Sequence, residues 1–279
     1  MTNITVVTTF HQAGLEKYGQ RFIDSFANCV DKRIKLWVYA EDCNPVNPDS
    51  DQIVILDAVK ELPKLQRFKK LWKGVPKANG VCPWPNRRPR DHHKAFKWDA
   101  VRFANKVYAV FDACERSKDW VVWMDADTYV HSNWSYDQFR ELLPDTSWIT
   151  YVGRGSHVQT WPECGFYGLN LTDVVCQEFL REFESYYEQA ETKMFIQEEW
   201  HDSFIFGLVL DQFKKTAPNV IDYTAELVLK GAKTGGGGHP LINSKLGAWI
   251  DHLKGDRKEL GRSHLKDVVV NRNKNYWNK

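Results

Sequence analysis

The sequence contains no run of about eighteen apolar residues, the length that a helix needs to cross a bilayer. Its first residues, MTNITVVTTFHQ, lack the basic stretch, long apolar segment and small-residue cleavage site of a secretory signal. No CxxC pair and no zinc-type spacing occurs among the six cysteines. We therefore expect a soluble, cytoplasmic protein without a membrane span, whose thiols are reduced.

What is present is typical of a globular enzyme-sized chain. The 279 residues are 43% hydrophobic and 27% charged, with twelve tryptophans and no visible internal repeat. The net charge of +2 hides a basic segment between Lys64 and Lys97, where eleven Lys or Arg face a single acid, Asp91. Such a segment attracts diphosphates or nucleic acid, although a solvated loop without a ligand has the same composition.

The apolar pattern alternates between strands and helices. Strands are predicted at residues 4–10, 34–40, 53–56, 120–124, 148–152 and 165–171, and helices at 15–26, 100–114, 174–187 and 197–213. Residues 63–92, which are rich in proline, are predicted to be irregular, and Asp91 to cap the helix that follows. The glycines at 235–238 are predicted to form a flexible turn or hinge. Alternating elements of this kind predict an α/β fold with a mostly parallel sheet.

The strongest functional signal follows the apolar run WVVWM at 120–124. Asp125 and Asp127 come directly after it, at the carboxyl edge where open α/β sheets bind their ligands. A turn there lets both carboxylates reach one hard divalent cation, which can neutralise the diphosphate leaving group of a nucleotide. The sequence therefore predicts a metal and phosphate site at this edge.

An apolar strand followed by Asp125-Ala126-Asp127 resembles the DxD motif of the GT-A glycosyltransferases. The segment from Asp251 to Gly255 resembles the element near the C-terminus of that family. The resemblance implies a single GT-A domain over residues 1–279, with a nucleotide-binding half (1–130) and an acceptor and donor-sugar half (131–279), whose mostly parallel sheet is flanked by helices. It also implies Mn2+ or Mg2+ held by Asp125, Asp127 and His252, with Lys254 and Gly255 at the phosphates of a UDP-sugar.

The same resemblance assigns further residues. It implies that Thr8, Thr9 and Phe10, at the end of the first strand, contact the nucleotide, with Phe10 able to stack on the base. Lys97 would contact the donor, and the segment from Pro162 to Gly168 would face the donor sugar and the acceptor. In an inverting enzyme Asp202 would be the general base, with Glu163 second. In a retaining enzyme both would orient the sugar and stabilise positive charge at its anomeric carbon.

Other interpretations remain open at this stage. An apolar strand before Asp125-x-Asp127-Thr128 also resembles the haloacid-dehalogenase-type phosphatases, in which Asp125 would be the nucleophile. A non-catalytic protein that binds sugar or nucleic acid is a third possibility. For a transferase the acceptor is either a saccharide or a hydroxymethylated base in DNA, whose backbone Arg87, Arg88 and Arg90 would follow while Trp84 supports a displaced base.

Overall fold

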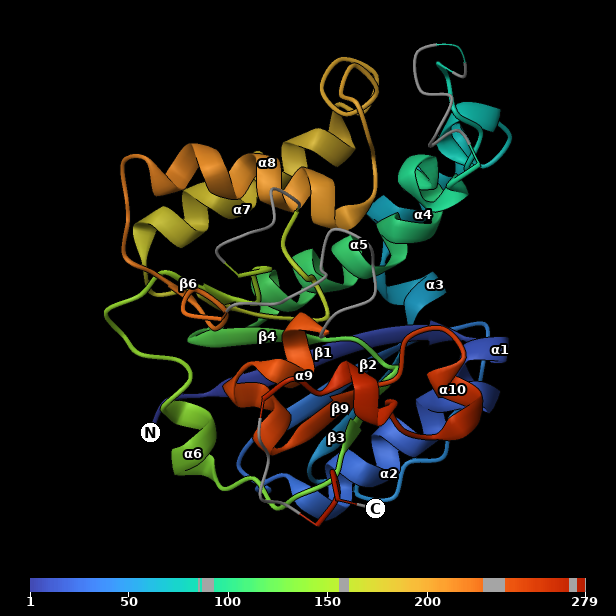
Figure 1. The fold of residues 1–279 in the computed structure, drawn as a ribbon. Coiled ribbons are helices and arrows are strands. Elements are labelled where there is room, and N and C mark those ends of the chain that lie inside the picture. Colours follow the sequence, from blue (N-terminus) through green and yellow to red (C-terminus); the bar gives the residue numbers. More distant parts are fainter. Residues whose placement is uncertain (85, 87–92, 156–160, 228–238, 271–274, 279) are drawn as a thin grey trace.

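The computed structural model describes residues 1–84, 86, 93–155, 161–227, 239–270 and 275–278. At its centre lies a seven-stranded sheet of order β3-β2-β1-β4-β7-β6-β8 (Figure 1). The strands are β1 (Ile4–His11), β2 (Lys35–Glu41), β3 (Ile53–Asp57), β4 (Trp120–Met124), β6 (Ile149–Tyr151), β7 (Phe166–Asn170) and β8 (Val220–Asp222). All neighbours pair in parallel except β7, which is antiparallel to both β4 and β6. The expected α/β class with a mostly parallel sheet is confirmed.

Helices cover both faces of the sheet (Figure 1). On one face lie α4 (Pro63–Trp72), α5 (Ala100–Arg116), α7 (Val174–Glu188) and α8 (Asp202–Lys214). On the other lie α2 (Gln20–Cys29), α6 (Tyr136–Arg140), α9 (Pro240–Asn243) and α10 (Arg257–Leu260). In the described ranges, no helix has the length and apolar character required to cross a membrane.

Short elements complete the chain around this framework. They are α1 (Gln12–Gly14), the π-helical turn η1 (Leu15–Gly19), α3 (Ala58–Glu61) and the 3-10 turns η2 (Pro76–Ala78), η3 (Ala95–Trp98), η5 (Lys245–Ala248) and η6 (Leu265–Asp267).

The alternation of side chains along the strands divides the core into two. On β4, Val121 and Trp123 pack with the layer of α5 and α7, whereas Val122 packs with the layer of α2. All five side chains of β4 are buried, which explains its unbroken apolar sequence. The polar residues that follow β4 are therefore the first that can reach solvent at this edge.

A separate two-stranded ladder joins the end of β4 to the C-terminal part of the chain. Strand β5 (Thr128–Val130) pairs antiparallel with β9 (Ile250–His252), and Thr128 lies opposite His252. Leu253 N also donates to the backbone oxygen of Asp127 at 2.8 Å. This ladder sets the distance between Asp127 and a histidine 125 positions later in the chain.

Two sequence predictions were wrong and two fall on residues outside the described ranges. Residues 63–72 form the regular helix α4, because Pro63 occupies the first helical turn, where a missing N–H costs nothing. The last predicted helix begins at Asp202 rather than near 197. Asp91, like the glycines at 235–238, lies outside the described residues, and α5 is capped by Asp99, whose side chain accepts from Arg102 N at 3.3 Å.

The capping role of Asp99 can be tested directly. Replacing Asp99 by Ala removes the acceptor for a first-turn N–H of α5, so the free energy of unfolding should fall by about 0.5–2 kcal/mol. Urea denaturation followed by circular dichroism measures this loss. Unchanged stability of Asp99→Ala would show that the cap contributes nothing.

Candidate functional site

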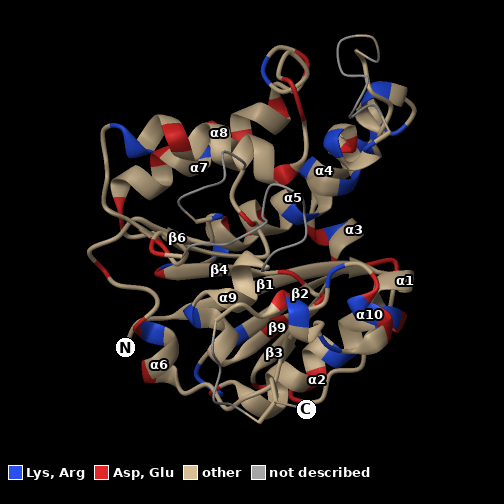
Figure 2. Ribbon diagram, in the orientation of Figure 1, with Lys and Arg blue, Asp and Glu red and all other residues tan. Residues whose placement is uncertain are grey.

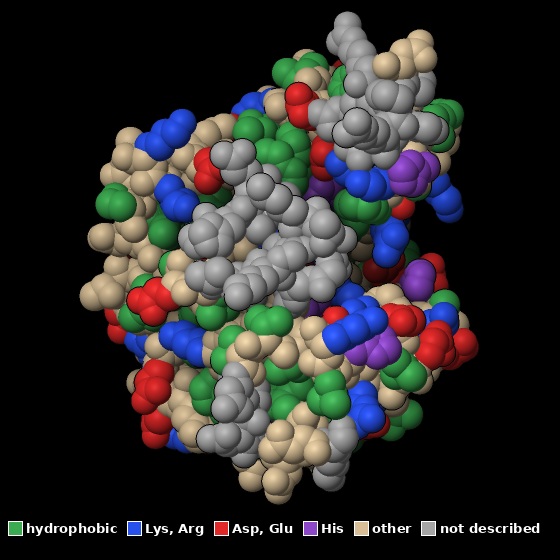
Figure 3. Space-filling view, viewed as in Figure 1, with side chains coloured by type: hydrophobic (Ala, Val, Ile, Leu, Met, Phe, Trp, Pro, Cys, Tyr) green, Lys and Arg blue, Asp and Glu red, His purple; other side chains and the backbone are tan. Residues whose placement is uncertain are grey.

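A cleft of about 1020 Å³ opens at the carboxyl edge of β1 and β4. It collects predicted site residues from all parts of the chain: Thr9, Phe10, Lys97, Asp125, Asp127, Glu163, Asp202, Lys254 and Gly255. Figure 3 shows that Lys, Arg and His side chains gather along the side of the molecule where the upper helical layer meets the C-terminal segment. Six Lys or Arg and six Asp or Glu line the cleft, so cations that can bind phosphate lie there beside an equal number of carboxylates.

Three of the predicted metal ligands converge. Nε2 of His252 lies 3.0 Å from Oδ1 of Asp127 and 3.5 Å from Oδ2 of Asp125. One ligand atom from each of the three residues lies within 4.8 Å of the others, so a single ion can reach all of them after small side-chain adjustments. The set of two carboxylates and one imidazole suits Mn2+ or Mg2+.

Backbone hydrogen bonds hold this arrangement in place. Asp125 N donates to Gly165 O at 2.9 Å, and Thr128 N returns to Asp125 O at 3.0 Å, which forms the turn between β4 and β5. Gly165 also makes room for His252: a Cβ at Gly165 would come within 2.6 Å of Cε1 of that ring. Only glycine at this position leaves the imidazole where it is.

The electrostatics of the aspartate pair favour the charged forms. Burial raises the pKa of Asp125, but the Lys106 ammonium and His252 outweigh it, and the pKa stays below its ordinary value. For Asp127, His252 and Lys258 overcome burial in the same way and lower the pKa. Burial alone would lower the pKa of His252, yet the two aspartates raise it to about 9. In the metal-free chain the imidazole is therefore protonated at neutral pH.

Lys106, on α5, is the central cation of the site. Its ammonium lies 3.1 Å from Oδ1 of Asp125 and 2.7 Å from Oδ2 of Asp202, and it also donates to the backbone oxygen of Cys164. Burial works against the charge of Lys106, but the two carboxylates raise its pKa well above the ordinary value. One buried lysine thus links a predicted metal ligand to a predicted catalytic residue.

The two predicted catalytic carboxylates are both buried at the cleft. Asp202 is 6% exposed in the first turn of α8, and His201, rather than Asp202, caps that helix. Glu163 is 3% exposed and pairs with Lys254 at 2.5 Å and Arg154 at 3.2 Å. Burial would raise the pKa of Glu163, but Lys254 and its other cationic neighbours lower it well below the ordinary value.

The end of β1 differs from the prediction. Side chains alternate along a strand, and those of Thr8 and Phe10 point into the core, with exposed fractions of 0% and 3%. The ring of Phe10 packs against Gly19, so no open face remains for a base, and Thr8 does not line the cleft. Thr9 does line it, and its hydroxyl donates to Tyr39 O at 2.6 Å.

Tyr18 supplies the aromatic ring at this end of the cleft. The π-helical turn η1 carries it, and π-helical turns are frequent at functional sites. The ammonium of Lys258 lies 4.7 Å from the centre of the ring and 3.0 Å from Oδ2 of Asp127. Burial and the two nearby aspartates raise the pKa of the Tyr18 phenol to about 12, so it stays neutral.

The remaining predicted donor contacts lie at opposite ends of the cleft. Lys97 is in η3, before α5 rather than within it, and its ammonium pairs with Glu199 at 2.7 Å. Glu199 also contacts Nε2 of His201 at 3.0 Å. Gly255 has a φ of 63°, a left-handed conformation that favours glycine, and no atom lies within 4 Å of the place of a Cβ. The backbone after Lys254 can therefore approach a ligand closely.

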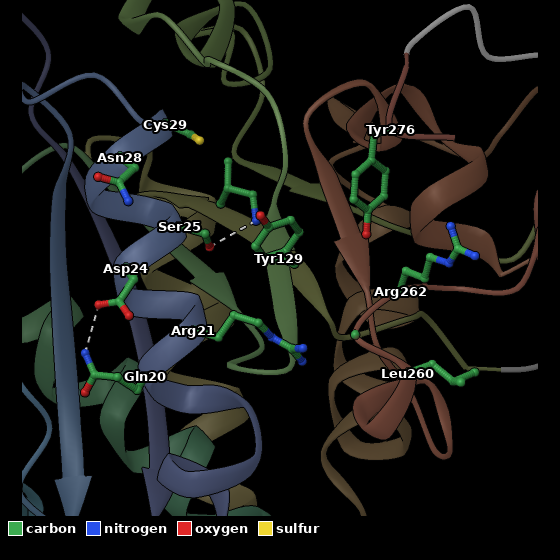
Figure 4. Close-up of a pocket in the computed structure, with 12 residues that line it drawn as sticks. Gln20, Arg21, Asp24, Ser25, Asn28, Cys29, Tyr129, Leu260, Arg262 and Tyr276 are labelled. Atoms are coloured by element: carbon green, nitrogen blue, oxygen red, sulfur yellow. Dashed lines mark hydrogen bonds between the residues drawn. The ribbon is translucent and has the colours of Figure 1, made fainter. Parts of the chain in front are cut away.

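A second pocket, of about 810 Å³, lies between α2 and the C-terminal segment (Figure 4). Residues such as Arg21, Asp24, Tyr129 and Arg262 line it. Inside it Ser25 accepts from Val130 N at 3.2 Å, and Gln20 donates to Asp24 at 2.9 Å. None of the predicted site residues lines this pocket, so the cleft at the sheet edge is the better candidate.

Sequence reasoning missed several residues of the site: Tyr18, Lys106, Arg154, His239 and Lys258. Lys106 could have been found from the sequence, because it lies one turn after Phe103 and one turn before the buried Val110. A lysine on the apolar face of a helix needs an internal partner. The others lie in irregular segments or short helices, where no periodic pattern marks them.

Comparisons with known proteins give no family and only distant structural similarity. No protein-family model matches the chain, and neither does any curated protein. Among solved structures it is similar to the apo form of WbbM, a bifunctional glycosyltransferase, with a TM-score of 0.46 and 13% identity over 79% of this chain and 38% of that chain. It is also similar to the apo form of mouse xyloside xylosyltransferase 1, with a TM-score of 0.44 and 10% identity over 78% of this chain and 83% of that chain. The chain thus spans much less than half of WbbM, and likeness at this level carries no information about activity.

The buried ion pairs of Lys106 predict a large effect on stability. Lys106→Met leaves the buried carboxylate of Asp202 and the half-buried carboxylate of Asp125 without their ammonium, so the free energy of unfolding should fall by about 3–5 kcal/mol. Adding Asp202→Asn should restore part of the loss, because one uncompensated charge disappears. Urea titrations compare these variants with Lys118→Met, a change at an exposed lysine. Equal stability of Lys106→Met and Lys118→Met would contradict the role given to Lys106.

Proposed function

We propose that the chain is a metal-dependent glycosyltransferase of the GT-A kind, which moves a sugar from a nucleoside-diphosphate sugar, a UDP-sugar, to an acceptor hydroxyl. The observation that carries the proposal is the convergence of the buried His252 with Asp125 and Asp127, which line a cleft at the carboxyl edge of the sheet. Lysines surround the same point, as a diphosphate requires.

The residues present fit a divalent cation. Asp125 and Asp127 would hold it through carboxylate oxygens and His252 through Nε2, the ring nitrogen that faces them. A bound Mn2+ or Mg2+ would neutralise the charge that develops on the departing diphosphate. Hydrogen bonds of the turn between β4 and β5 hold the backbone of this pair, so the ligands are preorganised rather than assembled by the ion.

The lysines balance the carboxylates in the metal-free chain and can change partners. Lys254 pairs with Glu163 and Lys258 with Asp127, and both side chains lie at the cleft. The diphosphate of a nucleotide-sugar carries about two negative charges and the cation two positive ones, so together they add almost no net charge. Lys254 and Lys258 are then free to turn toward the phosphate oxygens.

The roles expected for Thr8 and Phe10, whose side chains are buried, pass to Thr9 and Tyr18, which line the cleft and are less buried. Thr9 is placed for polar contacts to the nucleoside. The ring of Tyr18, over which Lys258 now lies, offers the aromatic face for the base. Movement of Lys258 toward the phosphates would uncover that face.

Asp202 and Glu163 flank the place of the reacting sugar. Asp202 is held by Lys106 and therefore keeps a fixed position beside Asp125. In an inverting reaction Asp202 accepts the proton of the acceptor hydroxyl. In a retaining reaction its charge stabilises the anomeric carbon, and Glu163 orients the sugar hydroxyls. Both courses use the same two carboxylates.

The acceptor is proposed to be a saccharide, because aromatic side chains line the cleft on the side of α5 and α8. Phe96, Phe103 and Trp161 contribute them, and Phe96 is 45% exposed. A hydroxymethylated base in DNA is the second candidate. The exposed Arg67, Lys70 and Lys73 on α4 favour it (Figure 2), whereas Arg87, Arg88 and Arg90 lie outside the described residues. Trp84 is half-buried and packs against Trp200, which leaves less of its ring for a base.

A phosphatase of the haloacid-dehalogenase type fits the same geometry less well. Its nucleophile would be Asp125, but Lys106 and Trp123 Nε1 both contact Oδ1 of that residue. Thr128 would have to present its hydroxyl to phosphate, yet it is 1% exposed and does not line the cleft. A non-catalytic binding protein would have no need for buried carboxylates beside the candidate metal ligands.

Donor binding is expected to need both the metal and Asp125. With Mn2+ present, UDP at about 100 times its Kd should stabilise the wild-type chain by about 2.7 kcal/mol, seen as a rise in Tm. Without the metal, or with Asp125→Asn, the rise should be small, because the diphosphate then faces an incomplete cation site. Differential scanning fluorimetry measures both, with Asp211→Asn at an exposed position of α8 as the matched control. Equal stabilisation of Asp125→Asn by UDP would refute the proposed site.

Metal affinity is expected to depend on pH through His252. Its pKa of about 9 in the metal-free chain means that binding must displace a proton below that pH. Mn2+ affinity should therefore rise by up to about tenfold per pH unit between pH 6.5 and 8.5. The folding stability of the metal-free chain should depend on pH in the opposite direction. The protonated imidazole of His252 stabilises the fold at low pH, and this contribution is lost as the pH rises toward 9. Calorimetric titration at several pH values would contradict the assignment if the affinity stayed constant.

A further inference from the structure

Three buried ring nitrogens beside the metal ligands have no hydrogen-bond partner among the described residues. They are Nδ1 of His252 and both Nδ1 and Nε2 of His239. An unpaired polar atom away from water is destabilising, so three in one place call for an explanation. Sequence analysis did not single out His239.

The two imidazoles are neighbours. Their ring centres lie 4.7 Å apart, with the planes at 79°. One ligand atom each from Glu163, His239 and His252 lies within 4.8 Å of the others. Since Nε2 of His252 faces the aspartates, Nδ1 is the nitrogen that remains for this second group. Small ring rotations can turn the contacts into hydrogen bonds.

Both rings are supported from behind. Gly165 lies against the ring of His252, and a Cβ there would be 3.0 Å from Nδ1. His239 precedes α9, and its backbone oxygen accepts from Asn243 Nδ2 at 2.9 Å and from Asn243 N at 3.2 Å. Asn243 also donates to Asp267 O at 2.8 Å. The position of His239 is thus fixed to the same C-terminal segment that carries His252.

A second metal ion is the other way to use this cluster, but the charges disfavour it. Glu163 already has two cationic partners, Lys254 at 2.5 Å and Arg154 at 3.2 Å. A divalent ion there would replace these partners or lie beside them, and the desolvated like charges would repel strongly. Hydrogen bonds between neutral imidazoles and the carboxylate add no charge.

We propose that His239 is a positioning residue for the metal ligand: it accepts the Nδ1–H of His252 and donates its own ring N–H to Glu163. The relay rests on the proposed metal site. It would keep Nε2 of His252 directed at the point where Asp125 and Asp127 would hold the ion, and metal-bound histidines commonly have such a partner on their second nitrogen. It also connects the metal ligand to Glu163, the carboxylate assigned to the sugar.

Mn2+ affinity, measured by electron paramagnetic resonance of the free ion, tests the relay without any need for substrate. His239→Ala should weaken binding by about 10–100-fold. His239→Gln, whose amide can both accept and donate, should recover part of the loss, as should free imidazole added to His239→Ala. His264→Ala, at a histidine outside the cleft, is the matched control and should bind as wild type does.

The outcomes separate the relay from the site itself. If His239→Ala binds Mn2+ as tightly as wild type, and Mn2+ binding still needs Asp125, the relay is overturned and the metal site stays intact. Two Mn2+ or Zn2+ ions in wild type and one in His239→Ala would show that the cluster is a second metal site, which also overturns it. A wild-type chain that binds no Mn2+ would remove the proposed function together with the relay. Weaker binding rescued by Gln or imidazole supports it, because a general loss of packing would not be rescued.

Discussion

The structure depends on the balance of charge at the carboxyl edge of one sheet. Four carboxylates are buried or half-buried there, and each has a cationic partner: Asp125, Asp127, Glu163 and Asp202 are paired by Lys106, Arg154, His252, Lys254 and Lys258. Buried charges persist only when they are paired, because desolvation costs several kcal/mol for each ion. A site balanced in this way can take up a cation and an anionic ligand together with little change in net charge.

The fold creates this edge through two separate pairings. The parallel strands β1 and β4 end side by side, which places Thr9 and Asp125 at one rim. The small ladder of β5 and β9 then brings the C-terminal segment to the same point, so that His252 and Lys254 reach residues from the first half of the chain. The C-terminal segment also packs into the core on the α2 face of the sheet through Leu241, Leu246 and Ile250, so the site is complete only when both pairings have formed.

Much of this could be predicted from sequence, for physical reasons. Buried strands of the main sheet are apolar and β-branched, so 4–10 and 120–124 were located correctly, and charges after β4 had to lie at the edge. The burial of the Thr8 and Phe10 side chains could not be predicted, because an apolar strand end does not reveal which face its side chains take. Helix α4 was missed because proline was interpreted as a breaker, although it suits a first turn. His239 had no detectable signal, since long-range contacts from irregular segments leave no period in the sequence.

The most direct measurement is the anomalous diffraction of crystals grown with Mn2+ and UDP. The account predicts one strong manganese peak within about 2.0–2.6 Å of a carboxylate oxygen of Asp125 and of Asp127 and of Nε2 of His252, with diphosphate oxygens in the same shell. Manganese elsewhere on the protein, or UDP bound in the cleft with these three side chains turned away from it, would contradict the account.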